Sequence, residues 1–228
     1  MSHSPKPSAR WRRRKEDRPG EIIAAALTCF AERGFAATRL DDVAHRAGVT
    51  KGTLYLYFPN KEELFKAVVR RTIVAKIEQG EALLAHSPDP APVLLERFIA
   101  HWLAVIGTPA SAIPKLILSE AGNFPDLARF YLEEVVLRGT ALVRKLLQTG
   151  IERGEFRPQS LEHAAICVIA PMILSMLWQH SFERHAGHPL DAAALCRTHL
   201  ELLLGGLTQA VPAAAAPRSV REPKKARR

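Results

Sequence analysis

The sequence predicts an all-α protein, with a three-helix helix-turn-helix DNA-binding domain at residues 19–65 and a helical ligand-binding and dimerisation domain at residues 66–208. Two observations lead to this fold class. Apolar residues recur at helical spacing in successive segments, and these segments are separated by breaks rich in glycine and proline. Two short helical segments also flank a turn that contains glycine, which is the pattern of a helix-turn-helix.

Composition limits the cellular setting. The chain has 228 residues, of which 47% are hydrophobic, an ordinary share for a globular protein. Its three cysteines lie far apart and form no CxxC pair, which argues against a disulfide framework or a zinc site: Cys29, Cys167 and Cys196. The first residues lack the order of a signal peptide. We therefore expect a cytoplasmic protein.

The formal net charge is +9, and the two ends of the chain carry the whole of this excess. Residues 1–18 are rich in Ser, Pro and Arg without an apolar period, which predicts a disordered basic arm. Residues 209–228 are rich in Ala, Pro and basic side chains, which predicts a disordered basic tail. Two interpretations remain open: the arm contacts DNA phosphates or the minor groove, or it is a solubilising tail.

The N-terminal domain begins with a helix expected over Glu21–Arg33, which buries an apolar face and ends at Gly34. Thr38 is expected to cap the next helix, which carries Leu40, Val43, Ala44 and Ala47 and ends at the turn glycine, Gly48.

Thr50 is expected to cap the second helix of the motif, Lys51–Phe58, which Pro59 ends. Asn60 caps a third helix, whose apolar period continues to about Ala85.

The helix over Lys51–Phe58 carries the functional argument. Leu54 and Phe58 share one side, which must pack inward. The remaining face suits a DNA major groove, because a glycine permits close approach, Thr and Leu can touch base edges, and Lys and Tyr can bond phosphates. Its residues are Lys51, Gly52, Thr53, Tyr55, Leu56 and Tyr57. The alternative for the two tyrosines is half-buried packing.

The run from the first helix to Leu64 and Phe65 resembles the TetR family of one-component transcriptional regulators. The matching positions include Gly34, Phe35, Thr38, Val43, Ala44, Ala47, Gly48, Val49, Gly52, Thr53, Leu54, Tyr55, Tyr57, Phe58 and Lys61. The resemblance implies an all-α homodimer with an N-terminal DNA-binding domain and a C-terminal domain for ligand binding and dimerisation.

Residue roles follow from the same resemblance. It implies phosphate contacts by Thr38, Tyr55, Tyr57 and Lys61, and groove contacts by Lys51, Gly52, Thr53 and Leu56. Thr50, which precedes the recognition helix, belongs to the same candidate set. Arg39 stands where the family usually has a second Thr or Ser, and it either adds a phosphate contact or is a solvated charge.

The C-terminal domain begins after a proline-rich break at residues 86–92. Helices are expected over Val93–Ile106, over Ile113–Ala121, and from Pro125 to about Arg153. Residues 118–156 resemble, more weakly, the C-terminal domains of AefR-like TetR regulators.

Two further helices are expected, one with Ser160 as its N-cap and one with Asp191 as its N-cap. Residues Ala164–Trp178 are apolar throughout except Ser175, and about fifteen residues with Pro171 inside are expected to be too short for a membrane span. An apolar helix in a soluble protein is buried on all sides. We therefore expect a homodimer through helices at about 160–185 and 191–208, reading a near-palindromic operator in double-stranded DNA.

Aromatic and sulphur-bearing residues suggest a pocket between the C-terminal helices, although core filling is the alternative for each: Phe98, Trp102, Phe130, Met172 and Met176. The scarcity of buried charge suggests a small hydrophobic effector. His101, on an apolar helix face, is expected to be a satisfied core histidine. His163 and Cys167 lie one turn apart, but no third metal ligand is placed by sequence.

No catalytic, cofactor or metal motif is present in the sequence, so no catalytic residue, cofactor or metal is predicted. The preferred function is a homodimeric repressor released from its operator by a ligand. One alternative is a non-sequence-specific nucleic-acid binder driven by the basic tails, which predicts a steep salt dependence. The other is a helical ligand-binding protein or enzyme with a vestigial DNA-binding motif.

Overall fold

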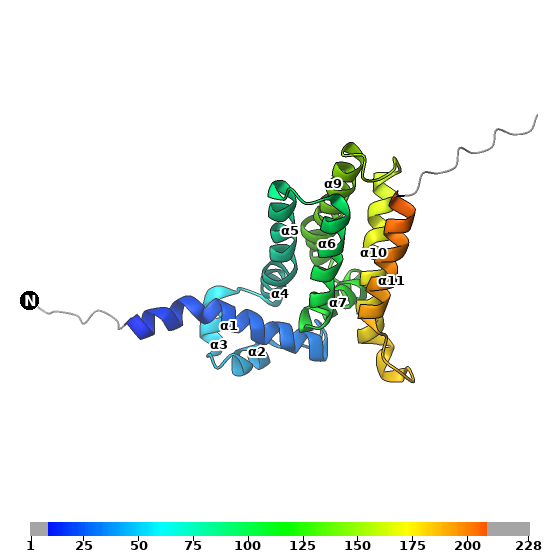
Figure 1. The fold of residues 1–228 in the computed structure, drawn as a ribbon. Helices are drawn as coiled ribbons and strands as arrows, with labels where there is room; N and C mark the ends of the chain where they lie inside the picture. Colours follow the sequence, from blue (N-terminus) through cyan, green and yellow to red (C-terminus); the bar gives the residue numbers. More distant parts are fainter. Residues whose placement is uncertain (1–8, 209–228) are drawn as a thin grey trace, which may run out of the picture.

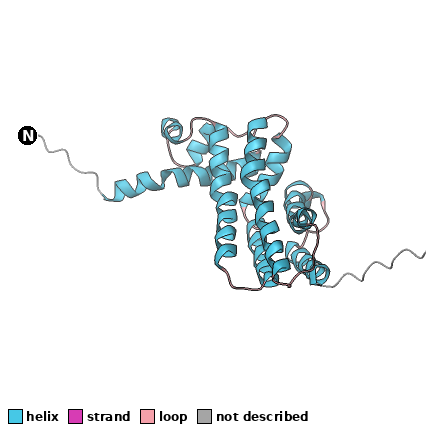
Figure 2. Cartoon of the chain, turned by 90° about the horizontal axis from the view of Figure 1, so that it is seen from above, coloured by secondary structure: helices cyan, strands magenta, loops and turns pink. Residues whose placement is uncertain are grey.

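The computed structural model describes residues 9–208, with side chains from residue 17 onward. Across these residues the chain is helical and contains no strand, which confirms the all-α fold class (Figure 2). Residues 1–8 of the expected arm and the basic segment 209–228 lie outside the described residues. A smaller N-terminal group of helices adjoins one end of a taller bundle (Figure 1).

The N-terminal domain consists of four helices: α1 (Ala9–Arg33), α2 (Leu40–Arg46), α3 (Lys51–Tyr57) and α4 (Lys61–Val69). Gly34 and Gly48 have φ of 82° and 65°, so both adopt the left-handed conformation that the turns require. Asn60 caps α4 by accepting a 2.8 Å hydrogen bond from the Glu63 N–H. The turn and cap predictions at these positions are confirmed.

Helix α1 begins at Ala9 and not at Glu21, so part of the expected disordered arm is helical. Pro19 lies inside this helix, although an interior proline costs a backbone hydrogen bond. The residues before it are mostly Arg, Lys and Glu, which favour helix strongly. Arg18 and Glu21 pair across the proline at 3.8 Å, which further supports a continuous helix.

Helix α4 continues without a break through a π-helical turn, η1 (Arg70–Val74), into α5 (Ala75–His86). The expected long helix is therefore confirmed, with a local irregularity at its centre. It joins the DNA-binding domain to the bundle as one rod (Figure 1). The next long helix has the same construction, since α8 (Pro125–Tyr131) passes through η3 (Leu132–Leu137) into α9 (Arg138–Glu152).

The rest of the bundle is formed by α6 (Ala91–Ile106), the 3₁₀ turn η2 (Pro109–Ala112), α7 (Ile113–Glu120), α10 (Leu161–Ser181), η4 (Glu183–His185) and α11 (Ala192–Thr208). Helix α10 packs against α6, α7 and α9, while α11 packs against α6 and α10. Asp191 caps α11 through a 2.9 Å bond from the Ala194 N–H. Ser160 makes no such cap bond, because its hydroxyl pairs with the His163 ring nitrogen at 2.8 Å.

An aromatic cluster of Phe30, Phe35, Phe65 and Phe124 connects the two domains. The ring of Phe35 lies 5.6 Å from Phe30, 5.3 Å from Phe65 and 4.9 Å from Phe124, measured between centroids. Phe124 belongs to the loop between α7 and α8, whereas the other three belong to the DNA-binding domain. Glu120 adds a polar contact, accepting a 3.3 Å hydrogen bond from the Ala36 N–H.

Helix α10 has 21 residues and a mean hydropathy of 1.7, so length and composition alone would allow it to cross a membrane. The expectation that this segment is too short was therefore wrong. Within residues 9–208 no other single helix meets these criteria, although α6 and the following segment to Glu120, bent by 90°, pass as a pair. Such a helix is weak evidence of a span, because core helices of soluble proteins pass the same test.

Candidate DNA-binding surface and ligand cavity

Helix α3 is anchored to the domain by its two inward residues. Leu54 is fully buried and Phe58 nearly so, as the helical spacing predicted. At its start, the Thr50 hydroxyl accepts a 3.1 Å hydrogen bond from the Thr53 N–H, so Thr50 is confirmed as the N-cap. Thr50 and Thr53 also share a 2.9 Å bond between their hydroxyls. The helix is therefore held in a fixed orientation.

The outer face of α3 is open. Leu56 is 83% exposed and Tyr55 is 44% exposed, so two adjacent large side chains of α3 face solvent. Gly52 is exposed as well, and a methyl group added there would meet only the Thr50 hydroxyl, at 4.0 Å. Tyr57 is half-buried and lies beside Phe58, with ring centroids 6.5 Å apart. The fold therefore gives Gly52, Tyr55 and Leu56 no structural task on this face.

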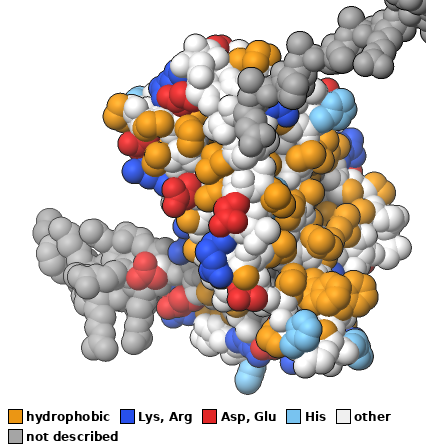
Figure 3. Space-filling view, turned by 45° about the vertical axis from the view of Figure 1, so that its right-hand side comes forward, with side chains coloured by type: hydrophobic (Ala, Val, Ile, Leu, Met, Phe, Trp, Pro, Cys, Tyr) orange, Lys and Arg blue, Asp and Glu red, His pale blue; other side chains and the backbone are white. Residues whose placement is uncertain are grey.

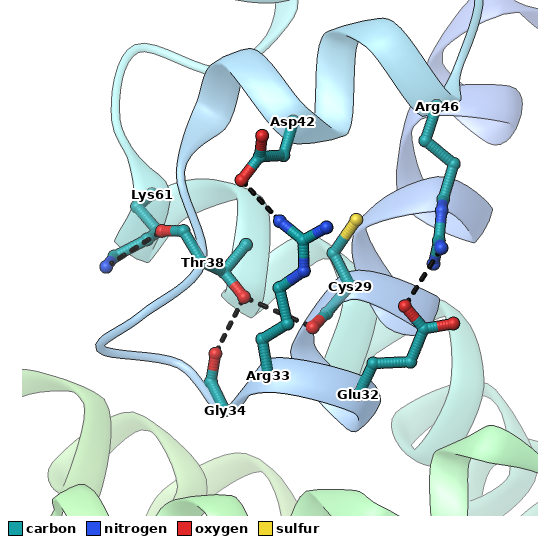
Figure 4. Close-up of polar contacts among 8 residues, drawn as sticks. All are labelled: Cys29, Glu32, Arg33, Gly34, Thr38, Asp42, Arg46 and Lys61. Carbon is teal, nitrogen blue, oxygen red and sulfur yellow. Dashed lines mark hydrogen bonds and ion pairs between the residues drawn. The ribbon is translucent and has the colours of Figure 1, made fainter.

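Acidic partners hold the basic side chains around the motif. The Lys51 ammonium lies 2.9 Å from the Asp41 carboxylate, and both side chains are exposed to solvent. The hydrogen bond to Asp41 and its charge raise the pKa of Lys51. At the back of α2, Arg33 pairs with Asp42 at 2.6 Å and Arg46 pairs with Glu32 at 2.9 Å (Figure 4). These pairs fix α2 on α1.

Thr38 does not cap α2, and its side chain is buried. Its hydroxyl donates towards the carbonyls of Cys29 and Gly34, at 3.2 and 2.6 Å (Figure 4). The Cys29 carbonyl belongs to the last turns of α1 and the Gly34 carbonyl follows the helix, so the hydroxyl ties the segment before α2 to the end of α1. The N-cap position belongs to Arg39, which is exposed and makes no side-chain cap bond.

Lys61 is also turned towards the protein. Its ammonium donates to the carbonyls of Ala36 and Thr38, at 2.9 and 3.2 Å, and lies 4.7 Å from the centre of the Phe35 ring. Burial lowers the pKa of Lys61. Thr38 and Lys61 thus turn inward and tie α4 to the end of α1, and Thr53 and Tyr57 are half-buried. The other predicted DNA-contacting residues are exposed: Arg39, Thr50, Lys51, Gly52, Tyr55 and Leu56.

A cavity of about 390 Å³ lies in the bundle, a volume within the range of small-molecule sites. It is bounded by the rod, α6, α9 and one residue of α10. Most of its wall is apolar, including Ile77, Leu142, Leu146 and Ile169. Its polar lining comes from two helices only, Lys76 and Gln79 on α5 and Arg97 and His101 on α6.

Of the five predicted ligand residues, only Phe98 and Trp102 line this cavity. Phe130 lies under cationic side chains, with the Arg70 guanidinium 4.8 Å from its ring centre. Met172 and Met176 are buried in the packing between helices. These three fill the core, because α10 turns its methionines towards neighbouring helices and not towards the cavity. Helical spacing alone could not distinguish residues that line the cavity from residues that fill the core.

His101 is the functional candidate that the sequence prediction missed. It lines the cavity, and its Nε2 atom is buried without a hydrogen-bond partner, so it is not the satisfied core histidine expected. Burial, with a smaller effect from the nearby charge of Lys76, lowers its pKa. His101 lies four residues after Arg97, so both side chains share one face of α6. This spacing was the sequence feature that could have identified His101 as a ligand-binding candidate.

Two family models match the chain. Residues 22–68 match the model for "Bacterial regulatory proteins, tetR family", and residues 93–189 match that for "AefR-like transcriptional repressor, C-terminal domain". The first match contains the anchored α2 and α3, and the second contains most of the bundle. The chain belongs to the TetR family.

Relatives of this TetR-family chain agree over nearly its whole described length. It is 28% identical to the transcriptional repressor KstR2 of Mycolicibacterium smegmatis, over 84% of this chain and 91% of the relative. The solved structure of the ketosteroid regulator KstR2 of Mycobacterium tuberculosis is 27% identical, with a TM-score of 0.65, covering 85% and 96% of the two chains. FadR of Bacillus subtilis shares the fold, with a TM-score of 0.69 at 24% identity, covering 82% and 98%.

Family membership, together with the open face of α3, makes this protein a DNA-binding transcriptional regulator. The family is regulatory and not enzymatic. Among the described residues no group of three or more His, Cys, Asp or Glu could hold a metal ion.

Proposed function

We propose that this TetR-family protein is a homodimeric cytoplasmic repressor that leaves a near-palindromic operator when a small apolar ligand fills its cavity. The observation that carries DNA reading is the outer face of α3, where Gly52, Tyr55 and Leu56 are exposed on a helix that Leu54 and Phe58 hold in place. The repressor assignment is supported by relatives that are named repressors.

The dimer is argued from an exposed apolar face. Ile166, Ala170 and Leu174 lie four residues apart along α10 and are all exposed, as is Leu202 on α11. Figure 3 shows apolar side chains gathered over the side of the molecule that these helices form. Such a patch marks a protein interface. A two-fold axis through it would place two α3 helices about 34–36 Å apart, one DNA turn.

The ligand proposal rests on the cavity and on two relatives. The FadR structure was solved in complex with stearoyl-CoA, and KstR2 is described as a ketosteroid regulator. Both names point to ligands with large apolar parts, which suits a wall formed mainly by Ile, Leu, Phe and Trp side chains.

Release from DNA would be a shift between two arrangements of the dimer. The cavity touches the rod at Ile73 and Ile77, just beyond the point where α4 leaves the DNA-binding domain. A ligand that moves α5 would therefore change the separation of the two α3 helices. A shift large enough to empty the operator requires several kcal/mol of differential affinity, about 5.5 for a change from 1:99 to 99:1.

The test is selection of binding sites by the purified full-length protein from a random DNA pool, beside Tyr55→Ala. Enrichment of an inverted repeat that the variant fails to enrich supports sequence-specific reading by α3. Sedimentation of the unliganded protein should give twice the monomer mass. Binding to all DNA with a steep salt dependence and no enriched site would instead favour the basic tails as the source of affinity.

A further inference from the structure

The ionisable lining of the cavity has one sign. Lys76, Arg97 and His101 contribute to it, and no Asp or Glu does. Lys76 and Arg97 are cationic and exposed to solvent, and the Asp89 carboxylate that pairs with Arg97 is not among the lining residues. The charged groups that line the otherwise apolar wall are therefore positive, which favours an anionic group on the ligand.

These groups also have bonding capacity to spare. The Lys76 ammonium makes a long 3.4 Å contact with the Gln79 side chain. Arg97 pairs with Asp89 through one of its terminal nitrogens, which leaves several of its five N–H donors available. The Nε2 atom of His101 is buried and has no partner in the protein.

A buried polar atom without a hydrogen-bond partner destabilises the folded protein. Water or a ligand must therefore bond to His101 inside the cavity. This favours a ligand whose polar group enters the cavity over one whose polar group stays in solvent.

We infer that the cavity binds the free carboxylic acid form of an apolar molecule, with its carboxylate held by Lys76, Arg97 and His101 and its apolar part against Phe98, Trp102 and Leu142. The inference rests on the proposed function and names the ligand class for the same site. It separates a free acid from a coenzyme A thioester, in which the acyl carbonyl is uncharged and the phosphates lie far from the apolar chain.

The experiment measures the affinity of the full-length protein for dodecanoic acid, dodecan-1-ol, methyl dodecanoate and dodecanoyl-coenzyme A by calorimetry. The acid should bind at least about tenfold more tightly than the alcohol or the ester, because hydrogen bonds to charged groups are stronger than those to neutral groups. Equal affinity for acid and alcohol, tighter binding of the thioester, or no binding by straight-chain acids from octanoic to hexadecanoic would overturn the inference.

Variants test the named residues. Lys76→Met keeps the apolar stem and should weaken acid binding about tenfold while leaving alcohol binding unchanged. Lys145→Met, on the exposed side of α9 and outside the cavity, is the matched control and should change neither affinity. His101→Leu should weaken acid binding, and His101→Gln, which retains a donor, should restore part of it. Equal effects of Lys76→Met on acid and alcohol would contradict the assignment.

Operator binding distinguishes failure of the carboxylate assignment from failure of the proposed repressor function. If the alcohol releases the protein from its operator as well as the acid does, ligand control stands and the carboxylate assignment fails. If selection yields no operator, the proposed function fails, and the calorimetric comparison still decides whether the cavity prefers an acid.

Discussion

Replacement of Gly52 by alanine should change folding and DNA binding in opposite directions. The new methyl group would meet no protein atom closer than the Thr50 hydroxyl at 4.0 Å, so it causes no clash within the domain. Alanine is favoured over glycine in a helix because it loses less backbone entropy, and the free energy of unfolding should rise by about 0.4–1 kcal/mol.

The same methyl group points away from the domain, to the face where α3 would approach base edges. Lifting the helix weakens the contacts of Thr53 and Leu56, and a single specific base contact contributes about 1–3 kcal/mol. Affinity for the selected operator should therefore fall at least about tenfold, measured by fluorescence anisotropy, while urea denaturation reports the gain in stability.

Gly107→Ala is the matched control. Gly107 follows α6 with φ of −75°, and an added methyl group would meet nothing within 4 Å. It should leave operator affinity unchanged. If Gly52→Ala gains stability and still binds the operator like the wild type, the backbone of α3 does not approach DNA at this position.

Three other changes test the bundle. Phe124→Ala removes the contact of the aromatic cluster with the ligand-binding domain. The effect of ligand on operator affinity, typically about 1–3 kcal/mol, should therefore shrink while ligand affinity persists. An unchanged effect would show that coupling runs through the rod alone. Gly150→Ala forces a methyl group into the Phe156 ring and should cost about 1–3 kcal/mol in urea denaturation, so a neutral result would refute this packing. Since the pKa of His101 is lowered, the unfolded chain binds more protons below about pH 6.5, and stability should fall as pH decreases through that range. His101→Gln should flatten this slope by no more than about 1.4 kcal/mol per pH unit; an unaltered slope would mean that His101 is not the group responsible.

The helix-turn-helix could be predicted residue by residue because its determinants are local. Gly48 must adopt positive φ, Thr50 and Asn60 must cap helices, and Leu54 must face inward at helical spacing; all four positions were confirmed. Each of these requirements acts within about one helical turn, so neighbouring residues suffice to reveal it.

Thr38 shows where local reasoning failed. Its sequence position suits an N-cap, but the hydroxyl bonds instead to the carbonyls of Cys29 and Gly34 at the end of α1. Lys61 likewise turns to carbonyls of the loop before α2. Both outcomes depend on how α1, α2 and α4 meet.

The cavity was the least predictable feature. Phe98, Met172 and Met176 are all apolar helix residues, yet only Phe98 lines the cavity of about 390 Å³. Whether an apolar side chain fills a core or borders a void depends on gaps left among several helices, and this geometry has no signature within any one of them.

The sequence by itself determined most of the helices, the turn, the face of α3 and the family, because period, caps and glycines act locally. Only the tertiary structure decided that Thr38 and Lys61 turn inward, that the rod borders a cavity, and that Lys76, Arg97 and His101 meet there. Those residues come from different helices, and their distances depend on packing that no single segment encodes.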